Sequence, residues 1–262
     1  VKGRFKSLAS DGRSAIIEHE EIPDYMPAMT MSFPVRNAAE LKKLNPGDAI
    51  AFRFVVTEND SWIEQVKRIS NDAVAASPAS RLRSGAPNQE PLEIGDLVPN
   101  FQLINQRGES FQLDDLMGKH VVLSFIFVRC PVPNFCPLMS ANFRKIQDQL
   151  AKEELFNEVR LLSVTIDPEF DTPEVLKTYA THYNANDARW IFATGSSQEI
   201  EGLTDRFAVY AERRDGTILH ELVTAYIAPD GRLVRVWRGN DWKPNHILGE
   251  LRTSLETALT AN

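Results

Sequence analysis

Cysteine is scarce in this chain: Cys130 and Cys136 are the two cysteines among 262 residues. One disulfide at most is available, so a core must come from the hydrophobic residues, which make up 43%. The longest apolar run, residues 121–128, is far shorter than the ~18 residues that a membrane-spanning helix needs. Basic residues number 29 against 36 acidic ones, so no surface for a nucleic-acid backbone is indicated. We therefore expect a globular chain with no membrane span and no nucleic-acid partner.

The first residue is Val1 rather than methionine, which is consistent with removal of an upstream signal or membrane anchor. Residues 1–70 alternate polar and apolar positions in short segments separated by turn residues, the pattern of β-strands. So many strands in so short a stretch favour a small, closed, OB-like five-stranded barrel, because closure removes exposed edges. The expected strands are residues 1–8, 14–19, 30–35, 49–57 and 61–69, with a short helix at 38–44.

A composition change follows. Residues 71–92 are rich in Ala, Ser, Pro and Asn and carry no apolar period, which indicates a linker. Residues 93–262 then alternate strands and helices, which predicts an α/β domain of the thioredoxin type. The expected strands are 121–128, 159–166, 190–193, 218–228 and 232–237, and the expected helices are 136–154, 173–183 and 197–207.

The cysteines lie in the loop between an expected strand and an expected helix. Cys130 follows the buried strand 121–128, and sites in open α/β sheets form beyond the carboxyl ends of strands. Cys136 precedes Pro137 and so stands at a helix start, where the helix dipole favours a thiolate. The intervening prolines exclude a helix across the loop, so it must curl for the sulfurs to meet. A structural disulfide, a redox couple and a pair of metal ligands all remain open.

A second group of soft donors lies in the first domain. Met26, Met29 and Met31 fall within six residues, and His19 ends the preceding strand. Met29 and Met31 are two apart on a strand and share a face. Thioether sulfur suits Cu(I) or Ag(I) and is a poor ligand for zinc, magnesium or calcium. Packing in the barrel core is the alternative for methionines.

These residues carry a family resemblance. The segment from His19-Glu through Met-Pro-Ala-Met-Thr-Met-Ser-Phe resembles the periplasmic CusF-type copper-binding domain over residues 1–70. The resemblance implies a small barrel in which His19, Met29 and Met31 hold Cu(I) or Ag(I). Members with an aromatic cap have tryptophan before the Pro-x-Met-Thr-Met run. This chain has Met26, a candidate for a further thioether ligand.

Residues 93–262 resemble the Sco/SenC family. Gly-Asp-Leu-Val-Pro-Asn-Phe at 95–101 is similar to its opening, and Val-Thr-Ile-Asp-Pro-Glu-Phe-Asp-Thr-Pro-Glu at 164–174 to its strand-to-helix segment. His220 matches the position of the family's histidine ligand. The resemblance implies copper held by Cys130, Cys136 and His220, and a periplasmic role at the CuA site of cytochrome oxidase. The commoner pattern has three residues between the cysteines, whereas this chain has five.

Together these features predict a periplasmic metallochaperone that takes Cu(I) from a copper donor and serves an oxidase CuA subunit. Copper, as Cu(I) with Cu(II) as an alternative at the cysteine site, is the expected cargo. The runner-up is a thiol-disulfide oxidoreductase in which Cys130 and Cys136 reduce cysteines of a copper-protein target. A passive copper buffer is a third hypothesis. Asp167 is a candidate for orienting a ligand, with capping of the next segment as the alternative.

Overall fold

A computed structural model describes residues 1–8, 13–20, 22, 29–57, 61–71, 74, 90–209, 211–214 and 217–260. The chain divides into two compact units, which are treated separately below. The first unit comprises Val1–Ala86 with Gly239–Trp242, and the second comprises Pro87–Arg238 with Lys243–Asn262. Most of the predicted linker, 71–92, lies outside the described residues. No helix in the described part of the chain is long and apolar enough to cross a membrane.

The first unit is built on one antiparallel sheet of five strands, as the alternation predicts, in the order β3-β2-β1-β4-β5. A single bridge between Val35 and Ile63 connects the two edges of this sheet, so full barrel closure stays a prediction. The inward positions of β2 are fully buried, since Ala15, Ile17 and His19 are each 0% exposed. The strands are β1 (Lys2–Leu8), β2 (Ser14–His19), β3 (Met29–Pro34), β4 (Ala49–Val56) and β5 (Ser61–Arg68), and the 3-10 helix η1 spans Ala38–Lys43.

Gly3 shows why β1 and β2 can lie so close together. A Cβ at this position would stand 2.6 Å from the Glu18 carbonyl oxygen and 2.9 Å from the His19 Cα. Real side-chain carbons do not approach backbone atoms so closely, hence only glycine fits opposite His19. The sequence therefore provides a close backbone contact beside the end of β2.

The second unit is organised by a seven-stranded sheet in the order β14-β13-β8-β9-β10-β6-β7, which confirms the α/β class. Strands β8, β9 and β10 are parallel, and every residue of β8 is buried, as expected of a central strand covered on both faces. The strands are β6 (Gln102–Asn105), β7 (Ser110–Gln112), β8 (His120–Ile126), β9 (Val159–Thr165), β10 (Trp190–Thr194), β13 (Val223–Ile227) and β14 (Leu233–Arg238).

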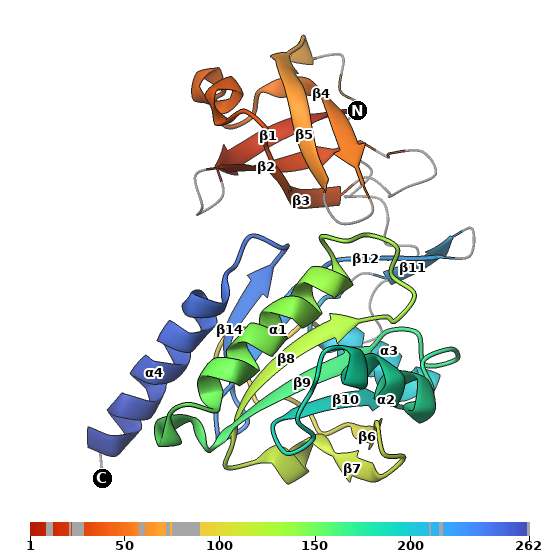
Figure 1. Cartoon of the computed structure of the whole chain (residues 1–262), viewed down its shortest axis with the longest axis vertical. Helices are drawn as coiled ribbons and strands as arrows, with labels where there is room; N and C mark the ends of the chain where they lie inside the picture. Colours follow the sequence, from red (N-terminus) through yellow and green to blue (C-terminus); the bar gives the residue numbers. More distant parts are fainter. Residues whose placement is uncertain are drawn as a thin grey trace. The chain divides into compact units, whose positions relative to one another are not determined.

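Helices cover this sheet, and their starts follow the sequence signals. Pro137 and Pro173 stand in the first turns of α1 and α2, where a missing N–H costs no hydrogen bond. Thr172 and Ser196 cap α2 and α3 with their side chains. Helices α1 and α4 lie side by side in front of the sheet (Figure 1). The α-helices are α1 (Cys136–Leu150), α2 (Pro173–His182), α3 (Ser197–Arg206) and α4 (Pro244–Thr260), with 3-10 helices η4 (Leu113–Leu116) and η5 (Glu154–Phe156).

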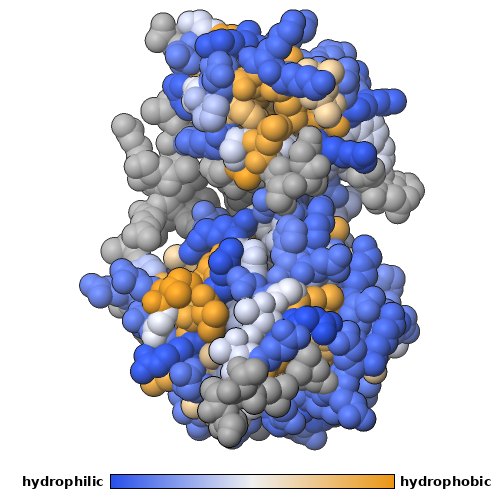
Figure 2. Space-filling model, turned by 90° about the vertical axis from the view of Figure 1, so that its left-hand side faces the viewer, coloured by the Kyte–Doolittle hydropathy of each residue, from blue (hydrophilic) through white to orange (hydrophobic). Residues whose placement is uncertain are grey.

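One predicted element differs from the structure. Residues 218–228 were expected to be a single strand, but the chain leaves its extended pairing at Glu221 and Leu222. The first part, β12 (Thr217–His220), pairs with β11 (Ala211–Arg214) in a separate two-stranded ribbon, and the second part is β13. His220 is therefore carried by a ribbon beside the main sheet. On the face shown in Figure 2, polar side chains predominate, with apolar surface in separate areas on each unit.

Candidate metal centre

The cysteine site forms where the carboxyl end of β8 meets the amino end of β13. These two strands are antiparallel, with Thr224 paired to Ser124, so the segment before β13 lies at the same edge as the segment after β8. This topology brings together His220 and Cys136, which are 84 positions apart. Cys136 Sγ lies 3.3 Å from His220 Nε2, and both side chains are buried.

The two cysteines also meet, so the loop between them curls as predicted. Both are free thiols, and their side chains are hydrogen-bonded to each other. Cys130 Sγ also faces the Val132 carbonyl at 3.9 Å, and the Val132 carbonyl accepts the Phe135 N–H at 3.0 Å, which closes the turn. Cys136 is fully buried, whereas Cys130 is partly exposed. Cys130 is thus the sulfur nearer to solvent.

In the metal-free protein, burial opposes the thiolate that the helix start favours at Cys136. Burial raises the pKa of Cys136 well above its usual value, and the hydrogen bond with Cys130 raises it further. The same bond lowers the pKa of Cys130, because the Cys136 thiol stabilises the Cys130 thiolate. Desolvation outweighs the start of α1 at Cys136, so Cys130 is the first of the pair to ionise.

His220 is held in a defined tautomer. Its Nδ1 donates to the Glu221 carbonyl at 3.0 Å, which leaves the Nε2 lone pair facing Cys136 Sγ. Burial lowers the pKa of His220 to about 4, although the Glu221 carbonyl opposes this shift. A neutral imidazole with a free Nε2 lone pair is the form that binds metals. Phe127 packs edge-on against the ring, with 5.6 Å between centroids.

The three residues are close but not yet arranged around a point. Among the described residues, no three His, Cys, Asp or Glu side chains form a complete metal site. Cys136 Sγ and His220 Nε2 share a 3.3 Å contact, whereas Cys130 Sγ faces the Val132 carbonyl at 3.9 Å. The donor set, two sulfurs and one imidazole, suits copper in its reduced form.

The first unit places His19 in a similar way. Its Nδ1 donates to the Glu20 carbonyl at 2.7 Å, and its buried Nε2 has no hydrogen-bond partner among the described residues. Burial lowers the pKa of His19 to about 4, so the ring is neutral near pH 7. A buried nitrogen lone pair left unpaired is costly unless it serves a ligand.

The backbone register of β2 and β3 relates two of the predicted methionine positions to this histidine. Met29 pairs with His19 across β2 and β3, and Met31 pairs with Ile17. Positions 19, 29 and 31 therefore share one face of the sheet. Met26 lies outside the described residues.

Two aspartates contact the residues just before Cys130: Asp167, a candidate named from the sequence, and Asp171. Asp167 Oδ2 accepts a hydrogen bond from Arg129 Nη2 at 2.7 Å, and a role of Asp167 in orienting a ligand stays a prediction. Asp171, which sequence reasoning did not single out, accepts a hydrogen bond from the Val128 amide. The sequence signal was available: both carboxylates sit in the loop after β9, at the edge where sites form.

The arrangement defines a class: a thioredoxin-like domain with a free cysteine pair and a histidine, preceded by a small β-sheet unit with an inward histidine. Residues 89–256 match the SCO1/SenC family, and residues 1–68 match the family described as copper binding periplasmic protein CusF. The chain belongs to the SCO1/SenC family, with a CusF-like segment ahead of the family domain.

Individual relatives agree with this assignment. The "SCO1 protein homolog" of Bacillus subtilis is 30% identical over 175 residues, which cover 65% of this chain and 88% of that protein. The "SCO2-like protein" of Rickettsia felis is 37% identical over 128 residues, 49% of this chain and 58% of that protein.

Solved structures show the same fold. A structure described as a "disulfide switch in BsSco, a member of the Sco family of cytochrome c oxidase assembly proteins" is 28% identical, with a TM-score of 0.55 over 64% of this chain and 98% of that chain. A SCO1/SenC family lipoprotein from Bacillus anthracis is also 28% identical, with a TM-score of 0.55 over 63% and 97%. The predicted thioredoxin-like fold is thereby confirmed.

Proposed function

We propose that this chain is a periplasmic copper carrier that binds Cu(I) in both units and delivers copper for the CuA site of cytochrome oxidase. Cys130, Cys136 and His220 would hold copper in the second unit. The carrying observation is the 3.3 Å contact between Cys136 Sγ and His220 Nε2, with Cys130 hydrogen-bonded to the same sulfur. His19, Met26, Met29 and Met31 would hold copper in the first unit.

The residues of the second unit have distinct tasks in this function. The Glu221 carbonyl keeps the proton on His220 Nδ1, so Nε2 can donate its lone pair to the metal. Copper displaces the Cys136 thiol proton, which leaves to solvent, and the sulfur becomes a thiolate ligand. Cys130, partly exposed and more acidic, meets incoming copper first. Periplasmic location is supported by the CusF match, and a lipoprotein relative supports an anchored form.

An anaerobic Cu(I) titration against a competing chelator tests this function. The full chain is compared with a Cys130→Ser/Cys136→Ser variant and with a Met29→Ala/Met31→Ala variant. Each pair of substitutions should remove one distinct tight site and leave the other at its original affinity. Unchanged copper stoichiometry in the cysteine variant would refute the proposal for the second unit.

A thiol-disulfide oxidoreductase is the second candidate, favoured by one observation. The hydrogen bond between the two thiols lowers the pKa of Cys130 and raises that of Cys136, so Cys130 would be the attacking thiolate and Cys136 the resolving thiol. Cys130 would attack a target disulfide, and Cys136 would then release the reduced target and leave a Cys130–Cys136 disulfide. A reduction potential below about −300 mV together with no exchange with a disulfide peptide would exclude this role.

A further inference from the structure

The turn that carries Cys130 is hydrogen-bonded to a different part of the chain, the segment between β9 and α2. After β8 ends at Ile126, the Cys130 N–H donates to the Phe127 carbonyl at 3.2 Å and closes a tight turn. The segment between β9 and α2 contacts both residues inside this turn. Arg129 bonds to Asp167, and the Val128 amide donates to Asp171 Oδ2 at 3.1 Å.

Asp171 is the central group of this contact. It is 0% exposed, and the same Oδ2 atom also accepts the Thr165 hydroxyl at 2.5 Å. Thr165 Oγ1 in turn accepts the Asp167 N–H at 2.9 Å. The end of β9 and the turn after β8 therefore both donate to Asp171 Oδ2, which links them. Asp171 Oδ1 is buried and has no hydrogen-bond partner in the part of the chain that the structure describes.

Burying an aspartate here has a cost, which its hydrogen bonds offset. Desolvation raises the pKa of Asp171 to about 6, which records the cost of burying its charge. Asp167 stands close enough to add to that cost, and Arg129 offsets part of it. An apolar side chain of similar size would avoid this cost, but it would leave the Val128 N–H and the Thr165 hydroxyl without the oxygen that now accepts both.

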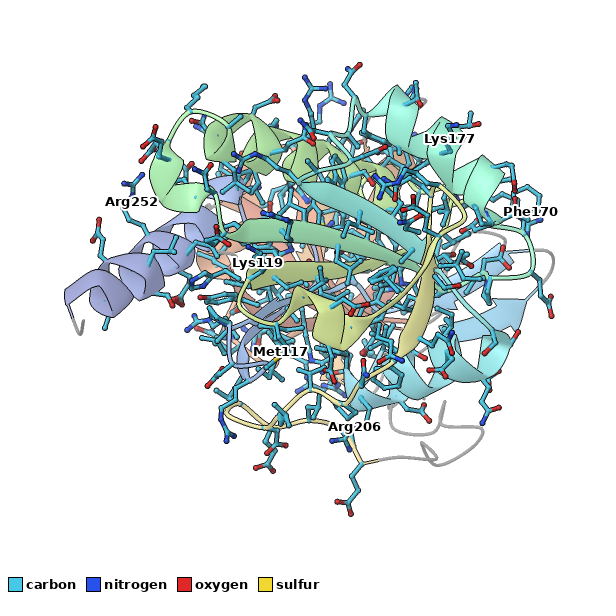
Figure 3. All side chains as sticks on the ribbon, turned by 90° about the horizontal axis from the view of Figure 1, so that it is seen from below. Met117, Lys119, Phe170, Lys177, Arg206 and Arg252 are labelled. Carbon is cyan, nitrogen blue, oxygen red and sulfur yellow. The ribbon has the colours of Figure 1, made fainter. Side chains whose placement is uncertain are left out.

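The protein surface next to Asp171 lies at the edge of the second unit. Phe170, the neighbour of Asp171, lies there near α2, which Lys177 marks (Figure 3). The Arg129 guanidinium stacks over the Phe170 ring at 3.8 Å. The outer face of the turn is thus held by Arg129, while Asp171 holds its buried face.

We propose that Asp171 is a positioning residue of the cysteine site, whose hydrogen bond to the Val128 amide fixes the turn from which Cys130 reaches Cys136 and His220. This inference rests on the proposed copper function of the second unit. The acceptor oxygen of the Asp171 side chain is what this role requires, because its partner is the backbone N–H of Val128. Without it the turn is released, and Cys130 Sγ loses its defined distance to the other two ligands. Outer partners of metal ligands typically change metal affinity by about 10-fold to 100-fold.

The test compares Asp171→Asn, which keeps an acceptor oxygen, with Asp171→Leu, which is of similar size and has none. Both are made in the full chain carrying Met29→Ala/Met31→Ala, so that only the cysteine site is titrated. Anaerobic Cu(I) competition should show the leucine variant about 10-fold weaker or more and the asparagine variant close to the parent. Thr165→Val is the control: it removes the other bond to the same oxygen, together with the acceptor of the Asp167 N–H, and should retain parental affinity because the bond to the Val128 amide remains.

A second measurement does not involve copper. The alkylation rate of Cys130 in the metal-free protein, on a Cys136→Ser background, should change in the leucine variant and be restored in the asparagine variant. Should the leucine variant fail to fold by circular dichroism, Asp171→Glu replaces it, because it keeps the charge but displaces the oxygen. The glutamate variant should then bind Cu(I) more weakly than the asparagine variant.

Each outcome decides the proposal. Parental Cu(I) affinity in a folded leucine variant would overturn it, as would equal losses in the asparagine and leucine variants, which would point to charge rather than to the hydrogen bond. Cys130→Ser/Cys136→Ser in the same assay separates the two hypotheses. If the double cysteine variant loses copper binding while every Asp171 variant keeps it, only the positioning role is rejected. If the double cysteine variant still binds copper, both the copper site and the positioning role are rejected.

Discussion

Acid should destabilise the first unit through His19. The ring is fully buried, its pKa is about 4, and the usual value is 6.5. Below about pH 6.5 the unfolded chain binds a proton that the folded chain does not, so stability falls as the pH is lowered towards the folded pKa. Between about pH 7.5 and about pH 5, this difference corresponds to a loss of about 2 kcal/mol.

The assay is urea unfolding of the metal-free chain at the two pH values, followed by backbone NMR signals of β2. His19→Gln removes the titrating group and keeps a side-chain N–H for the Glu20 carbonyl, so it should abolish about 2 kcal/mol of pH dependence. Ile17→Val, on the same buried face of β2, is the control. It should cost about 1 kcal/mol at both pH values alike. An unchanged pH dependence in His19→Gln would refute the reasoning, because the imidazole would then ionise equally in both states.

Three further outcomes follow from the packing and the thiol contacts. Iodoacetamide should modify Cys130 faster than Cys136 in the metal-free protein, because Cys130 is more exposed and its pKa is lowered; peptide mapping that finds the reverse order contradicts this. Gly3→Ala should destabilise the first unit by about 1–3 kcal/mol in urea unfolding, since its Cβ meets the Glu18 carbonyl at 2.6 Å; a neutral substitution would show that β1 can shift freely. Trp190→Ala should cost about 3–5 kcal/mol in the second unit, because Trp190 is fully buried; a loss under about 1 kcal/mol would show that the site collapses around the smaller side chain.

Local pattern was sufficient for much of the fold. Alternating polarity located the five strands of the first unit, and the position of Cys136 before Pro137 located the start of α1. Helix α4 was missed, although Ile247, Leu251 and Leu255 recur at helical spacing and are buried. The pattern was present there but was not used.

The site was less predictable, for a physical reason. His220 was singled out only by family resemblance, because its contact with Cys136 depends on β8 and β13 pairing across the sheet. The helix start favours a thiolate at Cys136, but burial is a tertiary property, and it outweighs the helix dipole and raises the pKa of Cys136. Asp171 escaped notice because no motif predicts which backbone amide a buried carboxylate will meet.

The wide separation of Cys136 and His220 has a consequence for the order of folding. Their contact joins positions 84 residues apart, whereas His19 and Met29 lie on adjacent strands of one hairpin. Contacts between distant segments form late, because the chain between them must first be ordered. A chain folding from its N-terminus would therefore present the His19 face early and would hold two cysteines without their histidine until β12 has docked. During that interval Cys136 would lack the burial that it has in the folded chain, and both thiols would be accessible to an oxidant.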